Sequence, residues 1–331
     1  YSPLLHADWN GLTPTDYIFP TFLFIMGTSI VLSLGRKAQS QPKKELIKKI
    51  IWRSIKIYIV GLILWLWPTF DFERIRWVGV LPRIAFVYFF TALLFVYTSR
   101  QTQLYTAIGL VVGYLILMCF VPVPGIGIPD LSVPEKNWAH YIDRLYLPGV
   151  LWQKTWDPEG ILSTLPAIAT GIFGMLAGYI IKSQKQLSEK LIELFIMGSV
   201  LLFFGDILQY IFPLNKNLWS SSFTLFLAGI SSLALGFFVF ICDLKQWGKH
   251  LTFAQIFGVN SIFTYALAGI LTTIFYSDRI WGFKFNDIFM EGLTAVGVAP
   301  KLASLLYALL YAGIIWLPAK YLYNKKIYIK L

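Results

Sequence analysis

The sequence HADWNGLTPTDYIFP (residues 6–20) runs directly into TFLFIMGTSI (residues 21–30), and together they form the most informative stretch of the chain. Its second part belongs to an apolar run near residues 17–35, about as long as a helix that crosses the hydrocarbon core of a bilayer. Its first part is polar and carries a lone histidine, His6. This pattern predicts a membrane-spanning helix with a titratable side chain in the loop before it.

The same apolar pattern recurs along the whole chain. Of its 331 residues, 57% are hydrophobic and 14% are charged, whereas soluble domains are about one quarter charged. We therefore expect an all-α polytopic membrane protein with about nine transmembrane helices, forming a single domain over residues 1–331. The apolar runs lie near 17–35, 51–67, 80–98, 104–121, 161–181, 191–212, 222–241, 253–275 and 302–322, with a short interfacial helix near 286–299.

The basic residues predict the orientation in the membrane. The loop after the first run is rich in lysine and arginine, so the positive-inside rule places it in the cytoplasm. Strict alternation then places His6 and the long segment 122–160 outside, on a mildly acidic face. Because this segment contains several tryptophans, we expect an ordered outer lid. The alternative is an aromatic belt at the membrane interface.

The residues around His6 combine a base with a helix start. Histidine can accept a proton at neutral pH. Thr13, Pro14 and Asp16 fit an N-cap, a first helical residue and the returning acid of a capping box. The positive end of such a helix can stabilise a developing oxyanion. The alternative is a surface histidine beside a cap that only begins a helix.

Two further groups of polar residues are candidates for a site. Asp157, Pro158 and Glu159 resemble a second helix start, whose carboxylates either begin the helix or hold a substrate at the outer face. Polar side chains in or near apolar runs are functional candidates, although snorkelling or helix–helix hydrogen bonds would also explain them. These are Ser29, Arg53, Arg83, Asp206, Gln209 and Asn260.

Two other patterns have simpler interpretations. Ala167, Gly171, Gly174 and Gly178 recur at helical spacing and predict close helix packing. The three histidines and two cysteines lack the spacing of metal ligands, so we expect no metal site.

Several motifs, in order along nearly the whole chain, resemble those of one family, the transmembrane heparan-α-glucosaminide N-acetyltransferases. They are His6-Ala7-x-Trp9-Asn10-Gly11-Leu12-Thr13-x-x-Asp16, Phe22-x-Phe24-Ile25-Met26-Gly27-x-Ser29-Ile30, Tyr141-Ile142-Asp143-Arg144-Leu145, Asp157-Pro158-Glu159-Gly160-Ile161-Leu162, Pro213-Leu214-Asn215-Lys216-Asn217-Leu218-Trp219-Ser220, Asn260-Ser261-Ile262 and Asn324-Lys325-Lys326-Ile327.

The resemblance implies an enzyme that takes acetyl from acetyl-CoA and passes it to the amine of a terminal glucosamine across the membrane. The family's catalytic histidine lies in the loop that matches His6, either as general base or as acetyl carrier, and we place Asp16 with it as catalytic. For the acceptor sugar we assign Trp9, Asn10, Asp157, Glu159, Asn217, Trp219 and Asn260. For acetyl-CoA we assign Ser29, Arg53 and Arg83.

Family members begin with one more transmembrane helix, whose outer end carries an asparagine implicated in the site. Because the chain starts at Tyr1, we expect that helix to be missing and the core to have ten helices with it. The large luminal domain of the animal enzymes is also absent from this sequence. We therefore expect a bacterial-type inner-membrane relative that acts on a free or terminal amino sugar. A homodimer is an expectation from the family alone, and no nucleic-acid partner is expected.

Two rival functions stay open at this stage. One is an amino-sugar transporter, which predicts inverted repeats and broken helices at the membrane midplane, and the sequence shows neither. The other is an O-acetyltransferase of envelope glycans, which would need the same histidine.

Overall fold

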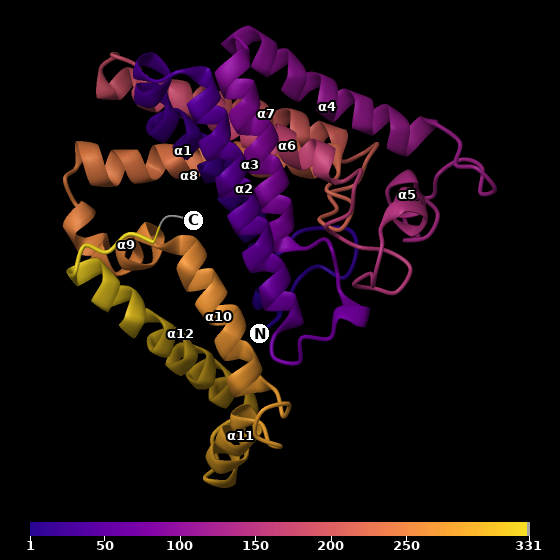
Figure 1. Cartoon of the computed structure of the whole chain (residues 1–331), viewed down its shortest axis with the longest axis vertical. Helices are drawn as coiled ribbons and strands as arrows, with labels where there is room; N and C mark the ends of the chain where they lie inside the picture. The colour runs from indigo at the N-terminus through magenta and orange to yellow at the C-terminus, as the bar shows by residue number, and fades with distance from the viewer. Residues whose placement is uncertain (330–331) are drawn as a thin grey trace. The chain divides into compact units, whose positions relative to one another are not determined.

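The computed structural model describes residues 1–329, which form helices joined by loops (Figure 1). No β-strand occurs among these residues, so the all-α fold predicted from the sequence is confirmed. The contacts divide the chain into two compact units. The larger unit consists of Ser2–Ile59 and Arg76–Lys245, and the smaller unit of Tyr1, Val60–Ile75 and the chain from Gln246 onward. The single domain expected from the sequence stays a prediction.

Most long helices belong to the larger unit. Its elements are η1 (Ser2–Leu4), η2 (Pro14–Tyr17), α1 (Ile18–Ser40), the first part of α2 (Lys43–Leu66), α3 (Val80–Tyr97), α4 (Arg100–Phe120), α5 (Trp138–Tyr146), α6 (Thr164–Lys182), α7 (Leu187–Leu208), α8 (Ser221–Val239) and η4 (Phe240–Leu244). The smaller unit holds the rest of α2, η3 (Phe72–Arg74), η5 (Gly248–Leu251), α9 (Thr252–Val259), α10 (Ser261–Tyr276), α11 (Phe285–Ala295) and α12 (Pro300–Asn324).

Seven helices in the described part of the chain are long and apolar enough to cross a membrane, and a bent pair would make an eighth. The apolar helices fit the predicted integral membrane protein, but the expected count of about nine is not confirmed. The missing member is α2, which contains the predicted run 51–67 but also carries Lys48, Lys49, Arg53 and Lys56. The short helix predicted near 286–299 is present as α11.

The predicted span over 253–275 is broken at Asn260. The helices on its two sides meet at 68°, so the expectation that the chain contains no broken helix is wrong. Asn260 leaves the helical region with φ −123° and ψ 44°. Its side-chain nitrogen donates to the carbonyl of Ile327 at 3.0 Å, and its Oδ1 accepts from the N–H of Ile329 at 2.8 Å. The side chain of Asn260 thus makes hydrogen bonds to backbone outside its own helix, and such bonds compete with a continuous helix.

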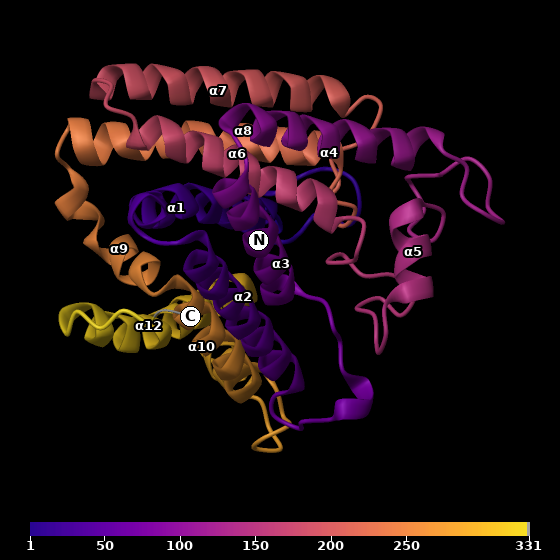
Figure 2. The ribbon, with the colours of Figure 1, turned by 45° about the horizontal axis from the view of Figure 1, so that its top comes forward.

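The glycine pattern of α6 does what the sequence predicts, because it brings α6 into contact with α1. A Cβ on Gly174 would lie 1.8 Å from the carbonyl oxygen of Phe24, and one on Gly27 would lie 1.9 Å from that of Gly171. Thr28 donates its hydroxyl to the Gly174 carbonyl at 2.8 Å across this contact. α7 packs along α8 in the same way that α1 packs along α6 (Figure 2).

One end of the larger unit gathers the loops that carry the predicted motifs, and we call it the polar end. It comprises residues 6–13, 76–79, 121–163 and 209–220. A buried apolar cluster contributes to this end and includes Tyr114, Met118, Phe212 and Leu218, with Trp9 and Trp138 packed against it. The phenol of Tyr114 donates to the Leu218 carbonyl at 2.7 Å. The end of α4, helix α5 and the 209–220 loop are therefore held together.

Candidate functional site

His6 and Asp16 form a direct pair at the start of α1. Nδ1 of His6 lies 2.6 Å from Oδ1 of Asp16. The carboxylate is buried, with 1% of its side chain exposed, whereas 57% of the imidazole is exposed. A carboxylate can only accept, so Nδ1 carries the proton and Nε2 is left as an acceptor. An exposed imidazole held by a buried carboxylate is an arrangement that suits a general base or a nucleophile.

The capping box predicted from Thr13 to Asp16 is confirmed. Thr13 is the N-cap, Pro14 is the first residue of η2, and the turn continues into α1. Oδ2 of Asp16 accepts from the Thr13 N–H at 3.0 Å, the Thr13 hydroxyl at 3.0 Å and the Ala7 N–H at 3.1 Å. The same carboxylate therefore begins the helix and orients the histidine.

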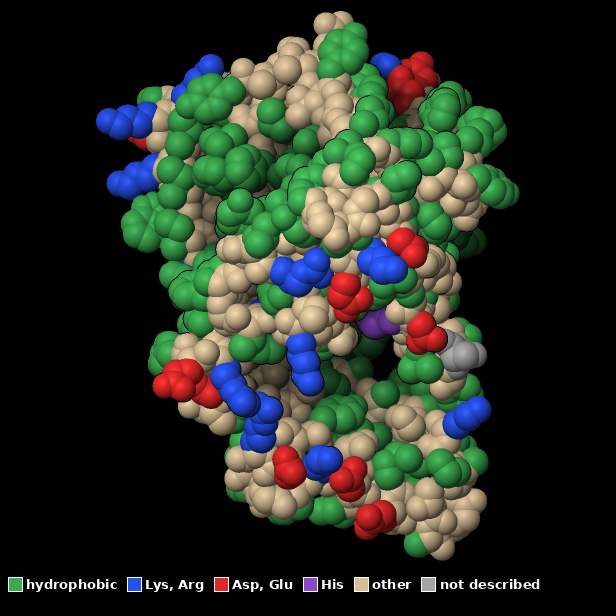
Figure 3. Space-filling model, turned by 90° about the vertical axis from the view of Figure 1, so that its right-hand side faces the viewer, with side chains coloured by type: hydrophobic (Ala, Val, Ile, Leu, Met, Phe, Trp, Pro, Cys, Tyr) green, Lys and Arg blue, Asp and Glu red, His purple; other side chains and the backbone are tan. Residues whose placement is uncertain are grey.

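Lys216, 210 positions further along the chain than His6, completes this group. Its Nζ lies 3.0 Å from Nδ1 and 3.3 Å from Nε2 of His6, and 3.4 Å from Oδ1 of Asp16. Lys216 lies in the motif from Pro213 to Ser220, but it was not among the predicted site residues because no local pattern marks it. Figure 3 shows that basic and acidic side chains lie close to one another on one face of the protein.

Backbone contacts hold the Lys216 loop against the His6 loop. The Gly11 N–H donates to the carbonyl of Leu214 at 2.8 Å. The Asn215 amide donates to Oδ1 of Asn10 at 3.0 Å. The two loops are thus joined through residues next to the charged group, and the lysine does not depend on its ion pair alone for its position.

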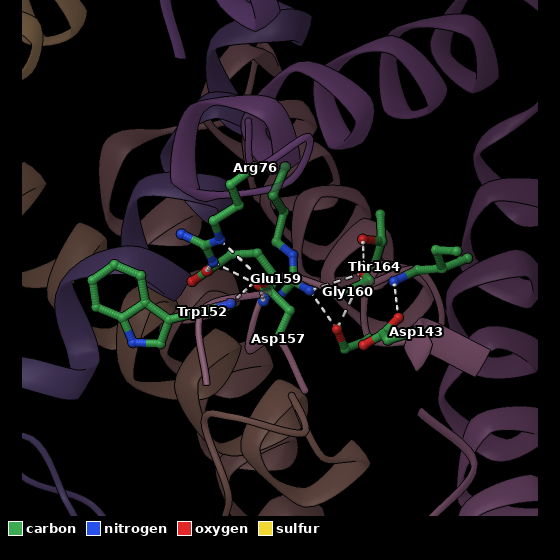
Figure 4. A network of polar contacts seen from close by, with 10 residues as sticks. Arg76, Asp143, Trp152, Asp157, Glu159, Gly160 and Thr164 are labelled. Atoms are coloured by element: carbon green, nitrogen blue, oxygen red, sulfur yellow. Dashed lines mark hydrogen bonds and ion pairs between the residues drawn. The ribbon is translucent and has the colours of Figure 1, made fainter. Parts of the chain in front are cut away.

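A second charged group lies deeper in the polar end (Figure 4). Arg76 donates through Nε and Nη2 to both oxygens of Asp157, at 2.7 and 2.6 Å, and through Nη2 to Glu159 at 2.5 Å. Its guanidinium also lies over the ring of Trp152, 5.0 Å from the centroid. Burial alone would lower the pKa of Arg76, but the hydrogen bond and charge of the two carboxylates raise it above its usual value.

This group corrects the second helix start predicted from the sequence. α6 begins at Thr164, with Ser163 as its N-cap, so Asp157 and Pro158 do not begin it. Instead, Oδ1 of Asp157 accepts from the Glu159 N–H at 2.9 Å. Both carboxylates are buried and bound to Arg76. Arg76 was not among the predicted site residues, because its partners lie about 80 residues further along the chain.

The peptide unit between Gly160 and Ile161 is held at both ends. Arg83 donates to the Gly160 carbonyl at 3.2 Å, and Asp143 accepts from the Ile161 N–H at 2.8 Å. A Cβ on Gly160 would lie 1.8 Å from Oδ2 of Asp143, which is why glycine fits here. Burial, with the charge of Asp157 added, raises the pKa of Asp143 to about 7.

Aromatic contacts attach the His6 loop to the segment 122–160. Trp9 donates to the Leu131 carbonyl at 2.8 Å, and its ring meets Trp156 edge-on at 5.3 Å between centroids. Trp156 stacks on His140 at 4.9 Å. Burial lowers the pKa of His140 to about 4, so this imidazole is neutral at pH 7. His140 therefore serves as an aromatic packing partner in this structure.

The remaining predicted site residues lie in different places. Asn10 is exposed and Asn217 is half-buried, and both are in the polar end. Trp219 is buried, with the Arg83 guanidinium 5.2 Å from its ring. Two other assigned residues lie elsewhere in the larger unit: Ser29 is exposed midway along α1, and Arg53 on α2 lies over the Tyr88 ring at 4.7 Å. Asn260 belongs to the smaller unit.

Two buried nitrogen atoms of Arg83 have no hydrogen-bond partner within residues 1–329. Among the described residues, its Nε and Nη1 and the Oδ2 of Asp143 make no hydrogen bond. Arg83 is 1% exposed, so these donors are not satisfied by bulk solvent. Arg83 therefore has two donors that could bind a ligand, and its predicted role in binding the cofactor stays a prediction. No group of metal-ligating side chains is present in the described part of the chain.

No protein-family model matches the chain. Among curated proteins, it is 31% identical over 326 aligned positions to the heparan-α-glucosaminide N-acetyltransferase of Mus musculus, covering 82% of this chain and 50% of that protein. It is 30% identical over 362 positions to the protein of the same name from Homo sapiens, covering 92% of this chain and 54% of that protein. The chain thus spans about half the length of these relatives. This similarity extends over most of the chain, which resembles the heparan-α-glucosaminide N-acetyltransferases over the part of their length that it spans.

Proposed function

We propose that this protein is a transmembrane acyltransferase that moves acetyl from acetyl-CoA to the amine of a glucosamine-type sugar. The observation that carries the proposal is the His6–Asp16 pair, with its 2.6 Å contact between a buried carboxylate and an exposed imidazole. The relatives are named as N-acetyltransferases of a glucosaminide. Acetyl-CoA as donor follows from that chemistry, because a thioester is the common activated form of acetyl.

The proposed reaction needs a base and a stabilised oxyanion. The sugar amine attacks the thioester carbonyl, the C–N bond forms, and the carbonyl electron pair moves to oxygen. Nε2 of His6 takes the proton from the amine. The intermediate then collapses, the C–S bond breaks, and the thiolate leaves with that proton. In the alternative route His6 first carries the acetyl group on Nε2. Both routes use the nitrogen that the contact with Asp16 leaves free.

The predicted acceptor contacts divide by exposure. Trp9, Asn10 and Asn217 retain solvent access, and we propose that they contact the sugar directly. Asp157 and Glu159 are bound to Arg76, so we propose that they act by holding the wall of the site. Trp219 is also buried, and we propose that it too supports the wall of the site. Asn260, in the smaller unit, stays a proposed acceptor contact.

For the donor, we propose Ser29, Arg53 and Arg83. The two free donors on Arg83 could bind a carbonyl or phosphate oxygen. We also propose the orientation that the basic loops predict, with His6 outside and acetyl-CoA supplied from the basic side. A homodimer and an additional helix before Tyr1 stay proposals.

Transfer of labelled acetyl from acetyl-CoA to glucosamine, by the full-length protein in lipid vesicles, tests the function. His6→Ala should abolish transfer, and His250→Ala is the matched control because this exposed histidine lies on η5 in the smaller unit. Transfer that survives His6→Ala would move the base elsewhere. Alkali-stable product identifies an amide, whereas alkali-labile product would favour O-acetylation.

The broken helix at Asn260 favours a second candidate, an amino-sugar transporter, because transporters place broken helices at their binding sites. Counterflow of labelled glucosamine in vesicles without acetyl-CoA would support it. Absence of counterflow together with acetyl transfer would exclude it.

A further inference from the structure

Lys216 is the cation closest to the proposed reacting atom. Its Nζ lies 3.3 Å from Nε2 of His6, and 3.4 Å from the carboxylate that it would neutralise as an ion-pair partner. Its side chain is 21% exposed, so it is reached by a substrate yet largely shielded from solvent. A purely structural ion pair would place the ammonium on the carboxylate, whereas this one lies equally near the imidazole.

The start of α1 offers few alternatives for binding an oxyanion. The N–H of Thr13 is bound to Asp16, and the N–H of Asp16 is bound to the Thr13 carbonyl at 3.0 Å. Pro14 has no N–H to donate. At this helix start, which the sequence suggested as an oxyanion site, the N–H groups of Thr13 and Asp16 are therefore already hydrogen-bonded within the cap.

We infer that Lys216 is a catalytic residue whose ammonium stabilises the oxyanion of the tetrahedral intermediate. The inference rests on the proposed acetyl transfer at His6. Nδ1 of His6 donates to Asp16 and cannot also accept, so before reaction the ammonium donates to Nε2 and to Oδ1 of Asp16. When the thioester carbonyl approaches, one N–H of the ammonium turns to its oxygen.

The electron pair of the carbonyl moves to that oxygen as the new bond to carbon forms, and Lys216 keeps its proton throughout. The electron pair on oxygen then re-forms the C=O bond as the C–S bond breaks, the C–S electron pair leaves on sulfur, and His6 supplies the proton to the thiolate. The ammonium is needed only while the charge is on oxygen, so it should lower the barrier without changing substrate affinity.

Steady-state kinetics of Lys216→Gln and Lys216→Arg test the inference, with Lys154→Gln as the matched control. Lys154 is an exposed lysine of the 122–160 segment and has no role in the proposed reaction. We expect Lys216→Gln to lower kcat by about 100-fold or more, with KM for both substrates within about threefold of the wild-type values. Lys216→Arg should regain part of kcat, and Lys154→Gln should behave as wild type.

A second variant separates charge from folding. Lys216→Cys is alkylated either to a neutral thioether or, with bromoethylamine, to an ammonium of nearly lysine length. The alkylated wild type controls for Cys119 and Cys242, the two free cysteines. The inference predicts that only the ammonium product regains kcat.

Equal activity of the two alkylated products, or a Lys216→Gln variant that changes KM alone, would overturn the inference. The wild type and His6→Ala distinguish this failure from failure of the proposed function. If the wild type transfers acetyl and His6→Ala does not, the function stands whatever Lys216 does. If the wild type transfers none, both fall together.

Discussion

Arg76 binds both carboxylate oxygens of Asp157, through Nε at 2.7 Å and Nη2 at 2.6 Å, across 81 positions of the chain. Neither partner is accessible, because Asp157 is fully buried and Arg76 is 7% exposed. The pair therefore connects the loop just before α3 to the segment that leads into α6.

Arg76→Ala should destabilise the protein strongly, because it leaves the buried carboxylates of Asp157 and Glu159 without the arginine that pairs with them. Removing one partner of such a pair costs about 3–5 kcal/mol. Chemical denaturation in detergent should show this loss, and Arg74→Ala is the control because that side chain is exposed. Equal stability of the two variants would show that water replaces the arginine.

Asp16→Asn should remove activity more than stability. The amide keeps the shape of the side chain but no longer stabilises a positive imidazole, so we expect kcat to fall by about 100-fold or more. Stability should change by less than about 2 kcal/mol, since the helix start is retained. The exposed Asp8→Asn is the control. If the Asp16→Asn variant kept the wild-type kcat, Asp16 would serve only as part of the helix cap.

Two residues of α5, Asp143 and His140, should make the free energy of unfolding depend on pH in opposite directions. The pKa of Asp143 is raised to about 7, so its contribution to stability is complete below its unfolded pKa near 4 and is lost as the pH rises through 7. The pKa of His140 is lowered to about 4, so its contribution is complete above about 6.5 and is lost as the pH falls through 4. Each slope is at most about 1.4 kcal/mol per pH unit.

Single variants should expose each slope. Asp143→Asn should leave stability that rises from pH 4 to 6.5, and His140→Gln should leave stability that falls from pH 4 to 7. Denaturation at half-unit pH steps measures both curves. Parallel curves for the wild type and the two variants would show that these groups do not titrate differently in the folded protein.

Gly160→Ala should cost about 1–3 kcal/mol, because its Cβ would meet the Asp143 carboxylate. The same substitution at Gly109, where nothing lies within 4 Å of an added Cβ, should be neutral or slightly stabilising in α4. Adding Asp143→Ala should restore part of the loss at Gly160. Similar thermal shifts for both glycine variants would contradict the steric explanation.

The sequence predicted features that depend on neighbours along the chain. The cap from Thr13 to Asp16 and close helix packing at Gly174 follow from local spacing, and both are present. The partner of Gly174, helix α1, is known only from the structure. The break at Asn260 was missed because its cause is the chain near Ile327, far along the sequence. Arg76 and Lys216 were missed for the same reason, since a charge reveals its partner only after folding.

The dual attachment of Asp16 makes His6 an extension of α1. A helix whose apolar length differs from the bilayer thickness tilts or shifts to compensate. Because the carboxylate that begins α1 also holds the imidazole, such a shift would strain the hydrogen bonds and the ion pair that join the His6 loop to the 209–220 loop. The lipid thickness would then act as a regulator of the site, and transfer rates in vesicles of graded acyl-chain length would measure how closely the chemistry follows the membrane.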